Sequence, residues 1–567
     1  MTHAVEINKD NIELWKSFIA KSLKLLDIYR SLLDTYVLDF FTEDLWSCID
    51  PKWSGVFELL SPKQLAEFLS KDEILKTERV WPLSLLALRA SAFTYALPRK
   101  PIVNDSLFLD YLNKCHQSSA LRDTPRSDGD TGESNSKSDS TYLTSENAEN
   151  CGFEMVDHVD HTVAVSDEID APSFGTQNAK NLHDMHPLHK VEVSWGDAVS
   201  ELSPEGGQHK LLQHVFRRHL KPKKQHEIAR LAYIAAKVAH IACNDILVDV
   251  GSGQGHLSRF LAYGHSVRIV CLEAQDEFIK GAKKFDHQLE TAIEKMKRSA
   301  KYGVTFHLPL APRHAVCHLD VDMDPLIFEE VVKNTWPELD SRVETCGLLG
   351  LHTCGNLAAT LLRLFTHLPT CQAVISVGCC YMKLNENCNE TTSPGYPMSE
   401  FVKALASNRL TYEAREVACH AIEMYTDRLK LGAENLKVHC YRAALEEIII
   451  AHWPEHRHAG LRSVSHAHKM TFAEYAVAAV SRVENVKLNE DELTSEKTKT
   501  NLDRWMQVVV YYSLRLLLAP VVESVILLDR LLYLYEKDVE GVLLPVFDPL
   551  LSPRNHVLIA VKQRNTL

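Results

Sequence analysis

The sequence lacks any apolar run as long as the roughly 18–20 residues that a membrane-spanning helix needs. Its hydrophobic fraction of 45% and charged fraction of 24% are typical of a water-soluble globular protein. The first residues, MTHAVEINKDNIELWKSF, have neither the basic-then-apolar pattern of a secretory signal nor the acid-free, arginine-rich pattern of a transit peptide. We therefore expect no contact with a membrane and a cytoplasmic or nuclear location.

Cysteines at the spacing of a metal-ligand pair are also missing. The 14 cysteines contain no Cys-x-x-Cys unit, and their irregular spacing indicates a reducing compartment. A zinc site built from Cys371, Cys379, Cys380 and Cys388 would lack the paired spacing of structural zinc sites. No metal is therefore expected.

The chain has no general excess of positive charge, since its formal net charge is −13. The acidic stretch from Asp123 to Asn150 contributes seven acids against two bases. Lys210–Lys224 is the opposite, with six basic residues and no acid. This balance argues against nucleic-acid binding over a broad positively charged surface. The basic segment is nevertheless compatible with a local contact to RNA or to an acidic protein. The alternative interpretation is that the basic segment is only a solvent-exposed surface with no binding role.

A length of 567 residues predicts two or three folded parts. Residues 1–115 are expected to be helical, because apolar residues between Ile12 and Phe40 recur every three or four positions and Ser61 can cap a following helix. Residues 116–185 are rich in Ser, Asp, Glu and Asn and are expected to form a disordered linker. Residues 186–567 are expected to form the main domain, with helical insertions.

Strand and helix patterns alternate through the main domain. The predicted strands are Ile246–Val250, Arg268–Leu272, Gly347–Leu351 and Ala373–Val377, and the predicted helices are Gln225–Ala242, Leu257 onward, Phe278–Ala300 and Leu357–Phe365. Near the end, a helix at Val522–Tyr535 precedes two strands, Gly541–Phe547 and His556–Lys562. This order predicts an α/β fold with a mostly parallel Rossmann-like sheet. A closing β-hairpin at the sheet edge is typical of the class I methyltransferase variant.

A glycine-rich turn follows the first of these strands, in the segment Asp249-Val250-Gly251-Ser252-Gly253-Gln254-Gly255. Glycine lets the backbone approach a ligand closely. The third glycine of the nicotinamide fingerprint would fall one place later, where this chain has His256, so the spacing favours S-adenosyl-L-methionine over NAD. Glu273 ends the second strand, where an acid is expected to bind ribose hydroxyls. The predicted cofactor residues are Asp249, Gly251, Ser252, Gly253, Gly255, His256 and Glu273.

Six segments carry a resemblance to a known family: LKPKKQHEI (220–228), DVGSGQGHLSRFLA (249–262), GLHTCGNL (350–357), SVGCCYMKL (376–384), LDRLLYLYEKD (528–538) and SPRN (552–555). They resemble the methyltransferase-like 25 family of class I S-adenosylmethionine-dependent methyltransferases, over roughly residues 190–567. The resemblance implies the fold and the cofactor, and it suggests that Lys224, His226 and Glu227 face the cofactor. The Asp/Asn-Pro-Pro-aromatic signature of many N-methyltransferases is absent.

Two motifs after later strands complete the expected site. His352, Cys354, Gly355 and Asn356 follow one strand, at the sheet edge where open α/β sheets bind ligands, and are predicted to contact the cofactor; the alternative is that Asn356 caps the next helix. Cys379, Cys380 and Tyr381 follow the next strand. Both motifs are also similar to tRNA 2′-O-methyltransferases of the acceptor stem, which makes RNA a candidate acceptor.

Catalytic residues are less well defined, because methyl transfer mainly requires that the acceptor be positioned. If the acceptor is a hydroxyl group, His352 and His226 are the candidate bases. Cys380 and Tyr381 are further candidates, for a covalent step or for shaping the acceptor pocket.

The predicted function is methyl transfer to RNA or protein. Two alternatives remain: a non-catalytic adaptor that binds a partner through its N-terminal helices, and an oxidoreductase, which His256 disfavours.

Overall fold

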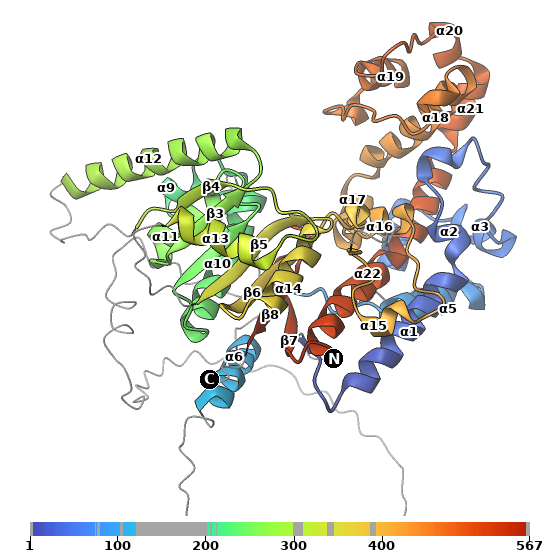
Figure 1. Ribbon diagram of the computed structural model, residues 1–567. Helices are drawn as coiled ribbons and strands as arrows, with labels where there is room; N and C mark the ends of the chain where they lie inside the picture. The colour runs from blue at the N-terminus through green and yellow to red at the C-terminus, as the bar shows by residue number, and fades with distance from the viewer. Residues whose placement is uncertain are drawn as a thin grey trace, which may run out of the picture.

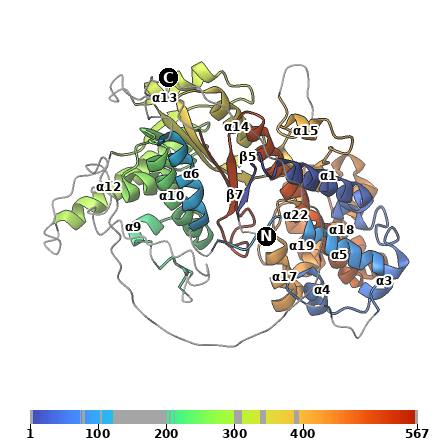
Figure 2. The ribbon, with the colours of Figure 1, turned by 90° about the horizontal axis from the view of Figure 1, so that it is seen from below.

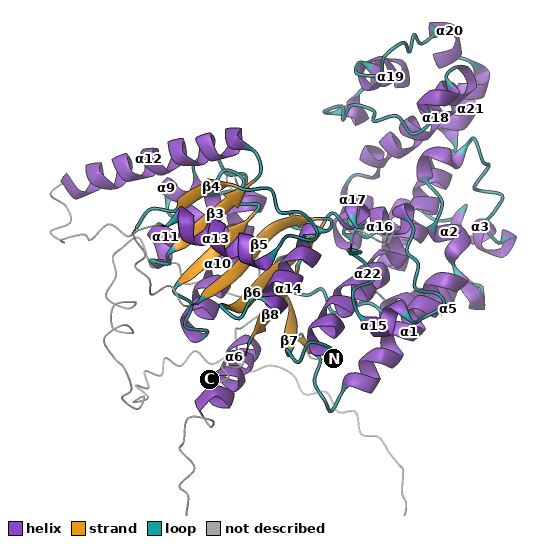
Figure 3. Ribbon diagram, viewed as in Figure 1, coloured by secondary structure: helices purple, strands orange, loops and turns teal. Residues whose placement is uncertain are grey.

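The computed structural model describes residues 4–73, 75, 80–102, 106–120, 201–203, 207–210, 212–298, 310–336, 345–385 and 393–562. A twisted sheet with helices on both faces lies beside a large group of helices (Figures 1 and 3). None of the described helices is both long and apolar enough to cross a membrane.

The sheet has eight strands: β1 (Val5–Glu6), β2 (Ile246–Val250), β3 (Ile269–Glu273), β4 (Arg313–Val316), β5 (Cys346–Cys354), β6 (Cys371–Cys379), β7 (Gly541–Pro545) and β8 (His556–Val561). Their order is β1-β7-β8-β6-β5-β2-β3-β4. Strands β2 to β6 are parallel, and β8 is antiparallel to both β6 and β7. The predicted α/β sheet with its C-terminal hairpin is confirmed.

The hairpin does not form the edge of the sheet, however. Strand β1, from the region predicted to be only helical, pairs antiparallel with β7 and aligns Val5 with Leu543. Two residues give too weak a sequence pattern to predict a strand. The first residues of the chain therefore belong to the same sheet as the last strands.

Neighbouring residues of the central strands face opposite sides of the sheet, as strand geometry requires. Val248 and Leu348 belong to one hydrophobic core, whereas Leu247 and Leu349 belong to the other. Because both faces are covered, the central strands are apolar along their whole length rather than alternately polar.

One face carries α6 (Ser106–Ala120), α9 (His214–Arg217), α10 (Pro222–Ile241), α11 (His256–His265) and α12 (Asp276–Arg298). Figure 2 shows α6 beside α10, and the two helices are in contact. Helix α6 extends to Ala120, so the predicted linker boundary at residue 115 lies too early. Residues 121–185 of that predicted linker lie outside the described residues.

The opposite face carries α13 (Pro325–Thr335), α14 (Leu357–His367) and the long helix α22 (Trp505–Tyr535). The sequence predicted α22 only from Val522 onward. The helix instead continues through Pro520, which removes a backbone hydrogen bond from its interior. Burial of nearly every residue from Val508 to Leu534 provides the stabilisation that offsets this loss.

Helices from both halves of the chain pack around α22, as the blue and orange ribbons of Figure 1 show. They are α1 (Ile12–Ile28), α2 (Arg30–Leu33), η1 (Val37–Phe40), α3 (Pro51–Phe57), α4 (Pro62–Leu69), α5 (Leu83–Thr94), α15 (Glu400–Lys403), α16 (Tyr412–Val417), α17 (Ile422–Leu431), η3 (Ala433–Leu436), α18 (Lys437–His452) and α21 (Glu496–Asp503). Contacts between α1 and α22, α4 and α17, and η1 and α18 join the two groups. A smaller apolar cluster on α18 contains η5 (Ala467–Lys469), α19 (Phe472–Val480) and α20 (Glu490–Leu493), and η4 (Pro454–His456) also contacts α18.

Two local expectations about these helices can be compared with the structure. The single amphipathic pattern from Ile12 to Phe40 is divided into three elements, because the helical backbone is interrupted at Tyr29 and again before Val37. The predicted capping box is confirmed: Ser61 Oγ accepts from the Gln64 amide, and the Gln64 side chain accepts from the Ser61 amide.

Candidate functional site

The candidate site lies where the carboxyl ends of the parallel strands β2, β3, β5 and β6 meet. The residues that follow these strands form its loops, and the glycine-rich turn follows β2. Open α/β sheets bind ligands at this edge.

The three glycines of the turn have left-handed backbone conformations, with φ of 70° at Gly251, 56° at Gly253 and 68° at Gly255. They differ in what surrounds them. A Cβ on Gly253 would meet no described heavy atom within 4 Å, whereas a Cβ on Gly255 would meet His314 at 3.2 Å and Ala282 at 3.3 Å. Gly253 therefore faces open space, and Gly255 allows the turn to pack closely against the protein.

Ser252 lies between the first two glycines, and its amide donates to the carbonyl of Leu272 at 3.2 Å. Its Oγ is buried and has no hydrogen-bond partner among the described residues. A buried hydroxyl usually has a partner, so an unpaired one beside open space is a candidate ligand contact.

Glu273, at the end of β3, holds the turn in place. Its carboxylate accepts from the Gly253 amide at 2.9 Å and from the Gln275 amide at 3.1 Å. The side chain is half-buried at the mouth of the turn. This position is compatible with the predicted contact to ribose hydroxyls.

Asp249 was predicted to accept a hydrogen bond from the cofactor, and the structure places it beneath the turn. The side chain is 2% exposed, and Ser258 Oγ on α11 donates to its carboxylate. Burial raises the pKa of Asp249 to about 7, although the Ser258 hydrogen bond and the Lys224 charge oppose this shift. Asp249 therefore connects the turn to α11.

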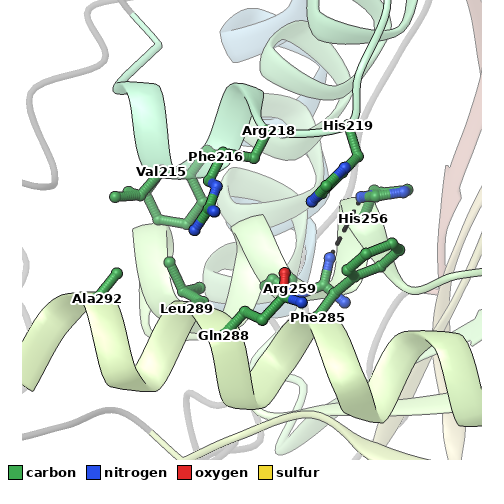
Figure 4. Close-up of a pocket in the computed structure, with 10 residues that line it drawn as sticks. All are labelled: Val215, Phe216, Arg218, His219, His256, Arg259, Phe285, Gln288, Leu289 and Ala292. Atoms are coloured by element: carbon green, nitrogen blue, oxygen red, sulfur yellow. Dashed lines mark hydrogen bonds between the residues drawn. The ribbon is translucent and has the colours of Figure 1, made fainter.

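His256 begins α11 and lines a small pocket between α9, α11 and α12 (Figure 4). Its ring stacks on Phe285, which also stacks on His219, with ring centroids 5.4 and 4.7 Å apart. Burial and the nearby Arg259 charge lower the pKa of His256 to about 4. The imidazole is thus neutral at neutral pH and packs as part of an aromatic stack.

Lys224, Glu227 and His352 meet beside the glycine turn, from helix α10 and strand β5. Lys224 Nζ forms a hydrogen bond with His352 Nε2 and an ion pair of 3.5 Å with Glu227, and His352 Nε2 is 3.8 Å from the Glu227 carboxylate. Burial, followed by the Lys224 charge, lowers the pKa of His352 to about 4. The structure brings together the three polar residues that the family resemblance and the strand-end motif had suggested separately.

His226, by contrast, does not belong to this group, and its expected role as a base is wrong. The side chain is completely buried. Its Nδ1 is 2.8 Å from Glu201, and its Nε2 accepts from the Asp548 amide at 3.0 Å. Both ring nitrogens are therefore occupied by the protein. The helical repeat explains the error, because Glu227 and Lys224 lie on one face of α10 while His226 lies on another.

Gly355 and Asn356 shape the loop after β5. Gly355 has φ of 58°, and a Cβ there would lie 2.6 Å from the Lys383 carbonyl oxygen, so only glycine allows this approach. Asn356 makes no side-chain cap to α14; its Oδ1 accepts from the Asn385 amide at 2.8 Å. The alternative that the Asn356 side chain caps α14 is therefore wrong, and Asn356 instead fixes a neighbouring loop.

Three thiols lie next to this loop, from Cys354 of β5 and from Cys379 and Cys380 at the end of β6. Their sulfur atoms are 3.3 to 3.7 Å apart. Cys380 Sγ also lies 4.0 Å from Arg554 Nη2. Hydrogen bonds with the other two thiols lower the pKa of Cys354, and the hydrogen bond with Cys354, followed by burial, raises the pKa of Cys379. Cys380 thus has a basic neighbour that its position in the sequence did not reveal.

Tyr381 begins η2 (Tyr381–Lys383) and is 1% exposed, which contradicts its expected place in an acceptor pocket. Its hydroxyl donates to Glu523 of α22 at 3.0 Å. Glu523 also pairs with Arg99, which follows the N-terminal helices. Tyr381 therefore joins the end of β6 to the helices around α22.

Sequence analysis missed two contributors from the C-terminal loop between β7 and β8. Ser552 Oγ donates to Glu227 at 2.7 Å, and Arg554 lies beside Cys380. The segment SPRN was part of the family resemblance, but no local pattern indicated that it would reach α10 and β6. Only the position of β8 next to β6 brings the loop there.

Comparison with known proteins agrees with this arrangement. Residues 223–387, which contain the glycine turn and both strand-end motifs, match a family described as a methyltransferase domain. The chain is also similar to methyltransferase-like 25 proteins. The probable methyltransferase-like protein 25 of Mus musculus is 32% identical over 237 residues, and that of Homo sapiens is 34% identical over 239 residues.

The similarity to the methyltransferase-like 25 proteins covers 39% of this chain and 38% of each relative. No solved structure matches the chain. The predicted resemblance to the methyltransferase-like 25 proteins and the α/β fold with a methyltransferase domain are confirmed.

Proposed function

We propose that the protein transfers a methyl group from S-adenosyl-L-methionine to RNA. The observation that carries the cofactor assignment is the glycine turn, where Gly253 faces open space and Ser252 Oγ is buried without a described partner. A polar ligand that fills this space would satisfy the hydroxyl group. Glu273, already oriented by the Gly253 amide, supplies an acceptor for ribose hydroxyls.

The cofactor would supply an activated methyl group for in-line displacement. The protein's own residues would position the acceptor, hold or remove its proton and exclude water. His352 is the better base candidate on geometry, because it reaches Lys224 and Glu227 at the site while His226 is enclosed by Glu201 and Asp548.

RNA is favoured as the acceptor by the basic segment before α10. Arg218, His219 and Lys221 are exposed there and line a surface hollow together with Arg217. The same segment continues into Lys224, which reaches the site. An exposed cationic surface that leads to a methyl-transfer site suits a phosphate backbone.

Isothermal titration tests the cofactor first. We expect S-adenosyl-L-methionine to bind and NAD not to bind. Gly253→Val, which fills the open space and strains the left-handed backbone of the turn, is expected to abolish binding, whereas Gly55→Ala, at a distant glycine in a helix, is expected to leave it intact. Absence of S-adenosyl-L-methionine binding to the wild-type protein would contradict the proposal and favour the adaptor interpretation.

The acceptor is tested by transfer of labelled methyl groups into fractionated RNA and protein. We expect label in RNA, reduced when Arg218 and Lys221 are both changed to Gln, and unchanged when the distant exposed residues Lys497 and Lys499 are changed in the same way. Label only in protein would refute RNA as the acceptor while leaving the methyltransferase assignment intact.

A further inference from the structure

The thiol groups of Cys354, Cys379 and Cys380 form a cluster at the carboxyl ends of β5 and β6. Cys354 Sγ lies 3.3 Å from Cys380 Sγ and 3.7 Å from Cys379 Sγ, and the last two are 3.4 Å apart. All three sulfur atoms lie within 4.8 Å of one another, so a single ion placed between them could contact each one.

The backbone is bent at the residue that completes this cluster. Side chains of consecutive strand residues point to opposite faces, so a continued strand would separate Cys380 from Cys379. Cys380 instead has φ 47° and ψ 56°, in the left-handed region that residues other than glycine rarely adopt. This conformation ends β6 and turns the second thiol toward the first. Strained conformations of this kind concentrate at functional sites.

Strand register brings in the third thiol. Strands β5 and β6 are parallel neighbours, and Cys354 aligns with Cys379. The sequence-based expectation of no metal considered Cys379 and Cys380 together with Cys371 and Cys388, and did not include Cys354. Cys371 lies at the opposite end of β6, and Cys388 lies outside the described residues.

Charge and size both fit a soft divalent cation. Thiolate ligands favour zinc and copper(I) among biological metals. With Zn–S bonds of about 2.3 Å, the sulfur atoms of a tetrahedral zinc site are about 3.8 Å apart. Three thiolates around a divalent ion leave one negative charge, and the Arg554 guanidinium, 4.0 Å from Cys380 Sγ, lies where it can balance that charge.

We propose that Cys354, Cys379 and Cys380 bind one zinc ion. Three S–Zn bonds form and the three thiol protons pass to solvent, with no change of oxidation state. Cys379 is buried, whereas Cys354 and Cys380 are half-exposed, so the fourth coordination position is open to water or to a group of the acceptor. Cys354 lies on β5, which neighbours the strand β2 that precedes the glycine turn, so the three thiols lie at the same edge of the sheet as the turn and share none of its residues.

The test is metal binding by the full chain, reduced and stripped of metal under anaerobic conditions. Zn²⁺ alone is added, and bound metal is counted after desalting by mass spectrometry. We expect one zinc per chain and protection of three thiols from a thiol-specific reagent. Co²⁺ in place of zinc is expected to give the thiolate charge-transfer absorption of three sulfur ligands.

The single variants Cys354→Ser, Cys379→Ser and Cys380→Ser are each expected to weaken zinc binding by about 10-fold or more. Loss of a direct ligand should reduce the affinity at least as much as loss of a residue that hydrogen-bonds to a ligand. Cys371→Ser, on the same strand, and Cys243→Ser, an exposed thiol elsewhere, are matched controls and are expected to bind normally. Thiol protection in the wild-type chain keeps the test valid if a variant fails to fold. Absence of zinc binding, equal binding by the triple serine variant, or a disulfide within the cluster that persists in place of metal would overturn the proposal.

Discussion

At the scale of single residues, two serines near the glycine turn have opposite surroundings. Ser252 Oγ is buried without a described partner, whereas Ser258 Oγ donates to Asp249. Removing an unpaired hydroxyl costs the folded protein little, while removing the donor leaves a buried carboxyl group without its hydrogen bond. The two residues therefore separate ligand binding from folding.

We expect Ser252→Ala to leave the free energy of unfolding within about 0.5 kcal/mol of wild type and to weaken S-adenosyl-L-methionine binding by roughly 2- to 10-fold, the equivalent of one hydrogen bond. Ser258→Ala is expected to destabilise the fold by about 1–3 kcal/mol. Denaturant titration and calorimetry measure the two effects. A Ser252→Ala variant that loses stability but keeps its affinity would contradict the assignment of Ser252 to the ligand.

The raised pKa of Asp249 predicts a pH-dependent stability. Its pKa is about 7 in the folded protein against an ordinary value of 3.8, so the folded state holds a proton that the unfolded state has released. The stability that depends on this proton is complete below pH 3.8 and is lost as pH rises through 7.

Asp249→Asn should therefore become more stable relative to wild type as pH rises from about 4 to 7. Thermal melting across this range measures the difference between the two proteins. Comparing them removes the contribution of other buried acids, such as Asp529, whose pKa is also raised by burial, to about 6. A difference that stays constant with pH would show that Asp249 is ionised in the folded state.

At the scale of elements, α22 connects the N-terminal helices to the site. Its Glu523 accepts from Tyr381 at the end of β6 and pairs with Arg99. These three side chains are almost completely buried, so the partners of Glu523 cannot turn to water when it changes. The contact between helix and sheet is therefore polar and specific as well as apolar.

Glu523→Gln is expected to destabilise the protein by about 1–3 kcal/mol, since Arg99 loses a buried charged partner. Glu423→Gln removes the other acid bound to Arg99, but that acid is 28% exposed and its loss should cost less than about 1 kcal/mol. Urea unfolding measures both variants. Equal effects would mean that burial does not distinguish the two ion pairs.

Local sequence patterns predicted much of the sheet and the glycine turn, because strand β2, the three glycines and Glu273 lie close together in the chain. Contacts between distant segments were not predictable in this way. Cys354 joins Cys379 only through the register of β5 and β6, and Ser552 reaches Glu227 only because β8 lies beside β6. His226 and Tyr381 looked functional by position but are buried in the protein.

At the scale of the whole molecule, the N-terminal helices are part of the hydrophobic core around α22. Buried residues such as Leu23, Phe40 and Phe68 belong to the same apolar cluster as Leu517 and Leu528. Helices packed in this way are not free arms for docking a partner, as the adaptor interpretation would require. Their removal would expose a large apolar face of α22 to water.

We therefore expect residues 201–562 alone to be insoluble or to lack a cooperative thermal transition. Co-expression with a separate fragment of residues 1–120 is expected to restore a soluble complex, which gel filtration and circular dichroism would detect. A fragment of residues 201–562 that melts cooperatively at the wild-type temperature would contradict this expectation and revive the adaptor interpretation.

The pairing of β1 with β7 has a consequence for biosynthesis. Val5 emerges from the ribosome roughly 540 residues before its neighbour Leu543. At about 5–20 residues per second, this interval lasts roughly half a minute to two minutes. During that time the N-terminal helices lack α22 as a partner. The nascent chain therefore presents apolar surfaces that a chaperone can bind until the last strands complete the sheet.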